Sequence, residues 1–210
     1  MKVVIFGASG KTGTLLTEQA LAKGQQVTAY ARREGAIKQK HPNLKVITGN
    51  LNDAARLNSA IVGADACFSV LGGGSLTRHA PEIVQGIDRI VSIMEAAGVR
   101  RFVYLSSIGA GESRNFMGPV IRFFIADVIL RVPLADHTAN ERRLSESKIQ
   151  WTVVRPASLT DGPRTGNLQN GNEKTLLKGN KKISRANVAS FMLEQLTDTT
   201  NLNKAVWLYE

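Results

Sequence analysis

Three glycines near the start of the chain lie in the segment Gly7-Ala8-Ser9-Gly10-Lys11-Thr12-Gly13, directly after a short apolar run. Between a strand and a helix, this spacing is typical of a loop that binds the pyrophosphate of a dinucleotide. The first glycine permits a tight turn, the second lets the main chain approach the pyrophosphate, and the third lets the helix pack closely. Free amides at the start of the helix then bind the negative charge. We therefore assign all seven residues to a cofactor site rather than to a simple turn.

Two arginines occupy the place where such a fold reads the ribose of the adenosine, about 20 residues past the loop. They are Arg32 and Arg33. A site selective for NAD needs a carboxylate there, whereas a guanidinium matches the 2′-phosphate of NADP in charge and geometry. Glu34, the nearby acid, is expected to fall past the pocket, and the alternative is a pair of solvated surface arginines. We predict that the cofactor is NADPH, and that Asn50 and Leu51, after the third predicted strand, also bind it.

Short apolar runs alternate with helical patterns along the chain, as expected for a parallel sheet covered on both faces. Strands are predicted at residues 2–6, 26–30, 45–48, 65–71, 102–105, 151–154 and 205–209. Helices are predicted at 12–23, 53–62, 81–97 and 185–197, with a broken helical stretch over 119–147. Pro133 should divide that stretch, so that its second helix begins near Leu134.

These elements predict an α/β fold, a single Rossmann-type domain over residues 1–210 with a doubly wound, mostly parallel sheet. After residue 154 the pattern becomes irregular and rich in turn-forming residues. We assign residues 155–183 to substrate-side loops. Because helix and strand patterns resume soon afterwards, the substrate region is short and C-terminal, without a domain of its own.

The composition is strongly basic, with 27 Lys and Arg against 17 Asp and Glu and a formal charge of +10. The basic residues are scattered in ones and twos, so we predict no nucleic-acid partner and expect an anionic cofactor and small-molecule substrate. The apolar stretch at 119–134 contains charged residues that make a membrane span too costly. Because the start of the sequence shows no signal-peptide pattern, we expect a cytoplasmic protein. We expect it to be either a monomer or a weak homodimer.

Cysteine and histidine give no sign of metal binding. The single cysteine, Cys67, lies inside a predicted buried strand, where packing is its expected role. The three histidines, His41, His79 and His137, share no spacing with Cys or carboxylates that suits a metal. We predict no metal site.

Several segments resemble the atypical short-chain dehydrogenase/reductases. Besides the glycine loop, these are Gly63-Ala64-Asp65-Ala66, Val103-Tyr104-Leu105-Ser106-Ser107 and Trp151-Thr152-Val153-Val154-Arg155-Pro156. The short length and the block at residues 136–144 resemble the biliverdin reductase B and flavin reductase branch and its NAD(P)H-binding relatives. The likeness spans nearly the whole chain and implies a nicotinamide cofactor.

The catalytic pair of the wider superfamily is missing. A typical member uses a tyrosine, with a lysine four residues later, to move a proton at the substrate oxygen. The tyrosines of this chain are Tyr30, Tyr104 and Tyr209, and none has a lysine at that spacing. Alcohol and ketone chemistry is therefore disfavoured. Hydride transfer to an acceptor that spreads charge over a conjugated system remains, and flavins, quinones and linear tetrapyrroles qualify.

The resemblance also implies residues beside the nicotinamide. Ser107 matches the active-site serine of the family, next to Ser106 at the carboxyl edge of the sheet, although a turn-capping serine is the alternative. His137 stands where the missing tyrosine would be, and Glu141, one helical turn on, is expected to orient or charge its imidazole. His137 would then donate a proton or contact an acidic group of the substrate. A surface histidine in a salt-bridged helix is the alternative. Further cofactor contacts are expected from Leu71, Gly72 and Gly73 under the ribose and from Pro156, Ala157 and Ser158 beside the carboxamide. Arg78 and His79 are expected in a loop that closes over the site.

One departure from the branch concerns the acceptor. Biliverdin-type enzymes can carry a histidine just after the proline that follows the sixth strand, and here Ala157 follows Pro156. This difference favours a flavin over biliverdin. The leading hypothesis is an NADPH-dependent reductase of flat conjugated acceptors such as FMN, quinones or biliverdin. The rival is a non-catalytic regulator that senses NADP(H), and a nucleotide-sugar epimerase or dehydratase is disfavoured by the absent tyrosine.

The arginine pair makes the cofactor preference testable by titration. We expect NADPH to bind about tenfold or more tightly than NADH, because a guanidinium pairs with the 2′-phosphate that only NADPH carries. The substitution Arg32→Ala should reduce the difference in affinity between the two cofactors, because it weakens the binding of NADPH and leaves the binding of NADH unchanged. Equal affinity of the unsubstituted protein for both cofactors would contradict this assignment.

Overall fold

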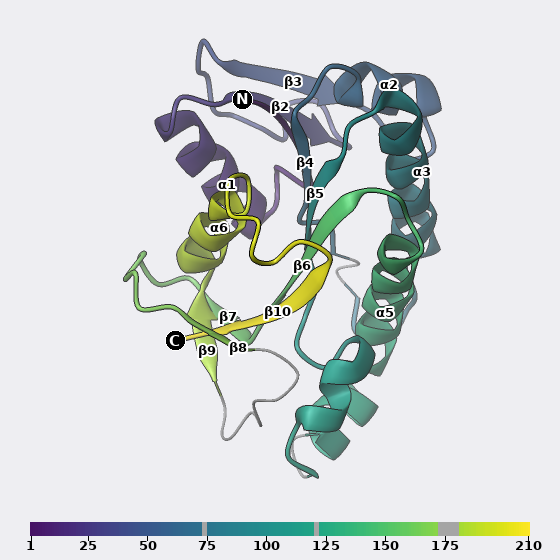
Figure 1. Cartoon of the computed structure of the whole chain (residues 1–210), viewed down its shortest axis with the longest axis vertical. Helices are drawn as coiled ribbons and strands as arrows, with labels where there is room; N and C mark the ends of the chain where they lie inside the picture. Colours follow the sequence, from purple (N-terminus) through teal and green to yellow (C-terminus); the bar gives the residue numbers. More distant parts are fainter. Residues whose placement is uncertain (73–74, 120–121, 172–180) are drawn as a thin grey trace.

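The computed structural model describes residues 1–72, 75–119, 122–171 and 181–210. Its elements form three layers, with a central sheet between two groups of helices (Figure 1). Helices α1 (Lys11–Ala22) and α6 (Arg185–Glu194) pack together on one face. Helices α2 (Ala54–Ile61), α3 (Pro81–Ala97) and α5 (Arg131–Ser145) cover the other face.

The described residues form a sheet of eight strands in the order β3-β2-β1-β4-β5-β6-β10-β8. Seven of these strands are parallel, and β8 pairs antiparallel with β10 at one edge. The strand order reverses between β1 and β4, and open sheets bind ligands at the carboxyl ends of strands at such a point. The bounds are β1 (Lys2–Phe6), β2 (Gln26–Ala31), β3 (Leu44–Thr48), β4 (Ala66–Ser69), β5 (Arg101–Leu105), β6 (Gln150–Pro156), β8 (Gln169–Gly171) and β10 (Lys204–Tyr209).

Three smaller features complete the described chain. Strands β7 (Ser158–Thr160) and β9 (Lys182–Ser184) form a separate parallel pair. A 3-10 helix, η1 (Gly111–Phe116), and a π-helix, η2 (Arg122–Ile129), lie between β5 and α5. Helix η1 follows β5 and strand β7 follows β6 in the chain, so both come after the carboxyl ends of these strands.

Apolar side chains are buried on both faces of the sheet, which is why its central strands are continuous apolar runs. Leu16 of α1 and Met192 of α6 are fully buried in the core on one side. Ile90 of α3 and Leu144 of α5 are fully buried in the core on the other side. Packing on both faces fixes the strand ends, and with them the loops that carry the candidate site.

The structure confirms the predicted fold class and corrects several boundaries. Helix α5 begins at Arg131 rather than near Leu134, because a proline such as Pro133 is tolerated in the first turn, where amides have no intrahelical acceptor. The strand predicted at 65–71 extends only over Ala66–Ser69. Strands β7, β8 and β9 fall in the region predicted as loops, and each has three residues, too few for a periodic signal.

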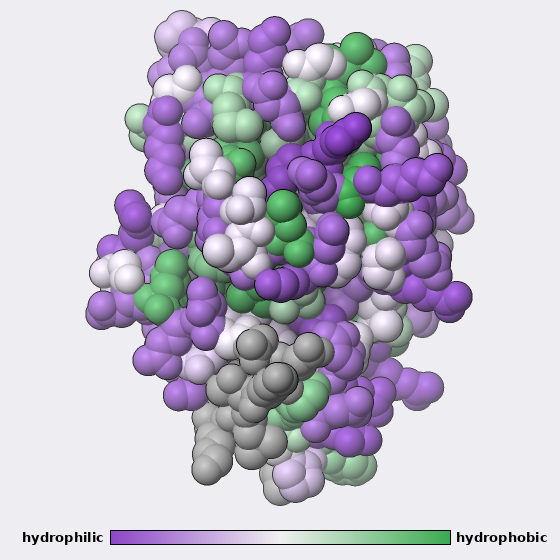
Figure 2. Space-filling model, in the orientation of Figure 1, coloured by the Kyte–Doolittle hydropathy of each residue, from purple (hydrophilic) through white to green (hydrophobic). Residues whose placement is uncertain are grey.

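On the face shown in Figure 2, hydrophilic residues predominate and the hydrophobic ones lie in small separate patches. In the described ranges, no helix is both long and apolar enough to cross a membrane.

A buried arginine ties the sheet to the end of α6. Arg101 is 7% exposed, and its Nε and Nη2 donate to the carbonyl oxygen of Gln195, at 2.9 and 2.7 Å. It also donates from Nη1 to the carbonyl oxygen of Gln150 and from Nη2 to Oγ1 of Thr152. Burial lowers the pKa of Arg101 to about 10, so the side chain stays charged at neutral pH.

Substitution Arg101→Met should lower the free energy of unfolding by about 3 kcal/mol, because the buried carbonyl group of Gln195 and the partly buried one of Gln150 lose their donors. Arg100→Met is the matched control, since Arg100 is the exposed neighbour and its loss should change stability by less than about 0.5 kcal/mol. Urea unfolding of both variants measures the difference. Equal stability of the two variants would show that the buried guanidinium does not hold the sheet and α6 together.

Candidate functional site

The glycine loop turns tightly between β1 and α1. Gly7 has a φ of +84°, a conformation that side chains disfavour, and a Cβ there would lie 2.9 Å from the carbonyl oxygen of Val70. A Cβ on Gly13 would lie 2.1 Å from the carbonyl oxygen of Gly7. Both positions therefore need glycine for reasons internal to the fold, the turn and the close packing of the helix.

Gly10 has no such internal reason to be glycine. A Cβ there would have Gly7 O, at 3.4 Å, as its nearest neighbour, and its φ is in the ordinary negative range. Gly10 is also the N-cap of α1, so it has no side chain that could bind the first amides of the helix. Open space and unsatisfied amides at one place fit a pyrophosphate.

The side chains of the loop differ in their surroundings. Ala8 and Thr12 are buried, and Ser9 is exposed. Lys11 Nζ lies 2.8 Å from Oδ2 of Asp161, so in this structure the lysine pairs with a carboxylate of the substrate-side region.

The expected adenosine end lies at the carboxyl ends of β2 and β3. Arg32 and Asn50 line one hollow there, and so does Glu34, so the expectation that this acid falls past the pocket is wrong. Arg33 is exposed outside the lining, and Leu51 packs against Gly86 instead. The lining that sequence reasoning missed is Thr48, Asp53 and Arg56, with Val46, Ile47 and Gly49.

A larger cavity of about 760 Å³ opens at the carboxyl edge of β4, β5 and β6. It brings together nine of the residues that the sequence assigns to the site, whereas Gly73 lies outside the described residues. The nine are Thr12, Leu71, Gly72, Ser106, Ser107, His137, Pro156, Ala157 and Ser158. Helix α1, the ends of three central strands and helix α5 thus converge on one space.

Two cations that sequence reasoning missed also line this cavity, Lys181 and Arg185. Arg185 Nη1 lies 2.5 Å from Oδ1 of Asp161, and Lys181 Nζ lies 5.2 Å from the centre of the Tyr209 ring. The hydrogen bond from Lys11 and the charge of Arg185 lower the pKa of Asp161. A signal was present, because Lys181 lies within the irregular region that was assigned to substrate and Arg185 lies just after it.

The two serines after β5 have different surroundings. Ser106 is buried and its Oγ donates to Oε1 of Glu141 at 2.5 Å. Ser107 is half-buried in the cavity wall, and its Oγ donates to the carbonyl oxygen of Ile108 at 3.1 Å. Ser107 is therefore the serine whose oxygen a ligand can reach.

Glu141 does not orient His137, contrary to expectation. Its carboxylate accepts hydrogen bonds from Ser106 and from Nε and Nη2 of Arg155, which is 2% exposed. Arg155 also pairs with Glu112 of η1. Burial opposes the charge on Arg155, but the hydrogen bonds to Glu141 and Glu112 outweigh it and raise its pKa.

His137 contacts the sheet instead of Glu141. Its Nδ1 lies 2.7 Å from the hydroxyl of Tyr104, a fully buried residue of β5, and Asn140 Nδ2 donates to the same hydroxyl at 2.9 Å. Burial lowers the pKa of His137, against the smaller opposing effects of the Glu141 and Asp136 charges. Burial also raises the pKa of Tyr104 well above its ordinary value.

The segment between β4 and α3 is attached to α5 through Asp136. His79 Nδ1 lies 2.6 Å from Oδ1 of Asp136, and the Ala80 amide donates to Oδ2 at 2.8 Å. Arg78 is not part of the cavity lining. Closure of this segment over the site stays a prediction.

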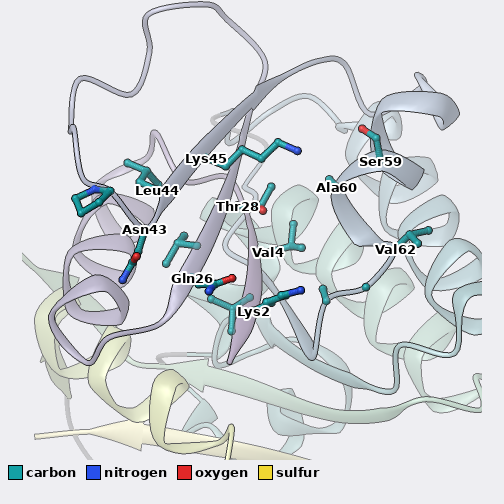
Figure 3. Close-up of a pocket in the computed structure, with 15 residues that line it drawn as sticks. Lys2, Val4, Gln26, Thr28, Asn43, Leu44, Lys45, Ser59, Ala60 and Val62 are labelled. Atoms are coloured by element: carbon teal, nitrogen blue, oxygen red, sulfur yellow. The ribbon is translucent and has the colours of Figure 1, made fainter.

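A separate hollow of about 340 Å³ lies at the opposite, amino edge of the sheet, where Figure 3 shows Lys2, Gln26 and Leu44 around it. Among its lining residues are none of those that the sequence assigns to the site. In the described ranges, no group of three or more His, Cys, Asp or Glu side chains could hold a metal ion.

A Rossmann-type sheet, a glycine loop at the start of α1 and a cavity at the carboxyl edge define a dinucleotide-binding protein. The chain belongs to the NAD(P)H-binding family, whose sequence profile matches residues 7–199. It therefore binds NAD(P)H, and the resemblance to the short-chain dehydrogenase/reductases is confirmed at this level.

Individual relatives agree with this assignment. One solved structure is that of ChuY, described as an anaerobillin reductase from Escherichia coli O157:H7. Its sequence is 25% identical to this chain, and the alignment covers 100% of this chain and 97% of that chain, with a TM-score of 0.82. A short-chain dehydrogenase/reductase from Veillonella parvula DSM 2008, solved in complex with NADP, has the same fold, with 21% identity, coverage of 100% and 94%, and a TM-score of 0.85. YhfK of Bacillus subtilis (strain 168), described as an uncharacterized sugar epimerase, is 25% identical, covering 100% of this chain and 94% of that protein.

The different reasons for glycine within the loop predict different consequences of substitution. Gly13→Ala should lower the free energy of unfolding by about 2 kcal/mol or more, because its Cβ would overlap the loop backbone. Gly10→Ala, the matched control, should leave stability within about 0.5 kcal/mol but weaken NADPH binding about tenfold or more, because its methyl group enters the space of the pyrophosphate. Urea unfolding and calorimetric titration measure the two effects. If Gly10→Ala binds NADPH like the unsubstituted protein, the pyrophosphate is held elsewhere.

Proposed function

We propose that this protein is an NADPH-dependent reductase that transfers hydride to flat, conjugated, anionic acceptors, with free flavins such as FMN first among them. The observation that carries the proposal is the make-up of the cavity at the carboxyl edge. Its described lining combines a reachable serine and histidine, Ser107 and His137, with two cations, Lys181 and Arg185, and contains no tyrosine.

The missing tyrosine restricts the chemistry. Reduction of an isolated ketone needs a proton at the oxygen as the hydride arrives, and the superfamily tyrosine supplies it. No tyrosine of this chain has a lysine four residues later, and Tyr104 is buried behind His137. A conjugated acceptor spreads the incoming charge over many atoms, so it reacts with less acid help. Placement of the acceptor at hydride-transfer distance then supplies most of the rate.

The two cations favour an acceptor with acidic groups. Lys181 is half-buried and Arg185 is held by Asp161, so both positive charges border the cavity at defined positions. A guanidinium and an ammonium bind phosphate or carboxylate groups through charge-assisted hydrogen bonds. FMN carries a phosphate and bilins carry carboxylates, and both are flat and conjugated.

The cofactor residues follow from the same geometry. The amides at the start of α1, with Gly7 to Gly13 around them, hold the pyrophosphate, and Arg32 in the hollow at the ends of β2 and β3 binds the 2′-phosphate. Leu71, Gly72 and the segment from Pro156 to Ser158 line the nicotinamide end. NADPH supplies the hydride when it is bound.

The relatives support a reductase but do not identify its acceptor, so the choice of acceptor depends on the residues of this chain. ChuY is described as an anaerobillin reductase, which is a precedent for a tetrapyrrole-type acceptor on this fold. Here Ala157 stands directly after Pro156, where biliverdin-type enzymes can have a histidine. This position favours FMN over biliverdin.

A second candidate function is a regulator that binds NADP(H) and passes the redox state to a partner protein. The same missing tyrosine favours it, because a sensor needs no acid. An epimerase is not proposed, although YhfK is described as one, since the described lining of the cavity has no tyrosine to act on a sugar hydroxyl.

Steady-state assays with NADPH and FMN, FAD, a quinone or biliverdin test the proposal, with NADPH absorbance as the readout. We expect turnover of FMN, and an increase of about tenfold in the KM for FMN in Arg185→Gln, because one charge-assisted hydrogen bond is lost. The KM for riboflavin, which lacks the phosphate, should not change.

Lys182→Gln is the matched control, because Lys182 is exposed, lies outside the cavity lining and carries the same charge. Its KM for FMN should stay within about twofold of the unsubstituted value, since a distant exposed charge is screened. If NADPH binds but no acceptor is reduced, the reductase is rejected in favour of the sensor.

A further inference from the structure

We infer that His137 acts as a neutral hydrogen-bond donor through Nε2 and keeps its proton during the reaction, and that Tyr104 is the positioning residue that holds it in this form. The inference rests on the proposed function, because it assigns what His137 does toward the acceptor. Sequence reasoning left two roles open for His137, donation of a proton or contact with an acidic group.

The contacts that carry the inference lie behind the cavity wall. His137 lines the cavity, whereas Tyr104 and Asn140 do not. The Tyr104 hydroxyl lies 2.7 Å from Nδ1 of His137, with the two rings edge to face. The Nδ1 side of the imidazole therefore faces the sheet, which leaves Nε2 as the ring nitrogen that can meet a ligand in the cavity. In the described part of the chain, no hydrogen bond engages Nε2.

The direction of the hydrogen bonds follows from what each group can donate. Asn140 Nδ2 can only donate, so the Tyr104 oxygen accepts from it at 2.9 Å. The single proton of the phenol then points to His137, and burial raises the pKa of Tyr104 so that this proton stays on the oxygen. A nitrogen that accepts cannot carry a proton, so the ring proton of His137 is on Nε2.

The reverse direction is disfavoured by its surroundings. It requires either a buried phenol proton left without an acceptor, or a rotated Asn140 amide, which would put N–H donors where Oδ1 now lies buried without a partner. A buried donor without an acceptor costs its desolvation free energy. It also requires either the other tautomer or a charged imidazole. Burial opposes the charged form of His137, and both nearby carboxylates are engaged, Asp136 with His79 and Glu141 with Arg155.

A neutral donor suits the proposed reaction. The acceptor gains a hydride and one proton, while NADPH is oxidised to NADP⁺. Negative charge builds on the oxygen or nitrogen of the acceptor as the hydride arrives, and Nε2–H of His137 stabilises it by a hydrogen bond. The proton that completes the reduction comes from water, because a proton taken from His137 would have to be replaced by that of Tyr104.

Nitrogen NMR on cofactor-free protein labelled with ¹⁵N-histidine tests the proton position without any turnover. The sequence has three histidines, so His41→Gln and His79→Gln variants assign the resonances of His137. Near neutral pH we expect Nε2 of His137 to carry the proton and Nδ1 to carry none. The ¹⁵N chemical shift of Nδ1 should be displaced from that of a free imidazole nitrogen, as for a nitrogen that accepts a hydrogen bond. In the Tyr104→Phe variant this displacement of the chemical shift should disappear. A proton on Nδ1 of the unsubstituted protein overturns the inference.

Kinetics on the substituted protein separate a hydrogen-bond donor from a proton donor. His137→Gln keeps an N–H at nearly the position of Nε2 and cannot give up a proton, so it should retain kcat for FMN within about threefold, whereas His137→Leu should lose about tenfold or more. Equal losses in the two variants overturn the assignment of His137 as a donor that keeps its proton.

The role of Tyr104 needs a cycle of substitutions. Tyr104→Phe should lower kcat about tenfold with the KM for NADPH unchanged, and should have no further effect in the His137→Leu background. Thr138→Val is the control for helix α5, because it also removes a hydroxyl with two hydrogen bonds, to Leu134 and Gly111, and should leave kcat unchanged. If the double variant loses as much kcat as the two single variants together, Tyr104 does not act through His137 and the positioning role is overturned. If the unsubstituted protein reduces no acceptor, the proposed function fails, and the NMR result still decides the proton position.

Discussion

The close approach of the main chain between Gly7 and Gly13 is the constraint on which the site depends. A Cβ at either position would overlap main-chain atoms, so glycine at both lets the first turn of α1 lie directly against the end of β1. The unsatisfied amides of that turn then face the carboxyl edge of the sheet, at the reversal of strand order. The position that we propose for the pyrophosphate is thus set by steric contacts inside the loop as well as by charge.

A second constraint lies on the other side of the cavity, where a buried ion cluster joins three elements. Arg155 at the end of β6 binds Glu141 of α5, and Glu141 accepts from Ser106 at the end of β5. Removing one partner would leave a buried charge unpaired, which is strongly unfavourable. The cluster fixes α5 against the sheet, and so it places His137 beside Tyr104. Glu141 supports the site through Arg155 and Ser106 rather than by touching the histidine.

Much of the fold and half of the site could be predicted from the sequence, for identifiable reasons. The glycine loop has a fixed spacing and the buried strands are continuous apolar runs. Because these signals are local, the fold class and the loop could be predicted from the sequence. The contacts of His137 were not, because spacing along a helix indicates Glu141 but contains nothing about Tyr104, thirty-three residues earlier. Lys181 and Arg185 had a weak signal, their place in or just after the irregular region, but only the folded chain brings them to the ends of β4 and β5.

The carboxylate of Asp136 is shared between the ring of His79 and the amide of Ala80, and Asp136 immediately precedes His137. The segment that contributes Leu71 and Gly72 to the cavity is therefore anchored, at its far end, to the turn of helix that carries the histidine. Loss of the Asp136 carboxylate would therefore release the residues directly before α3 from α5, at the turn that carries a residue of the cavity wall.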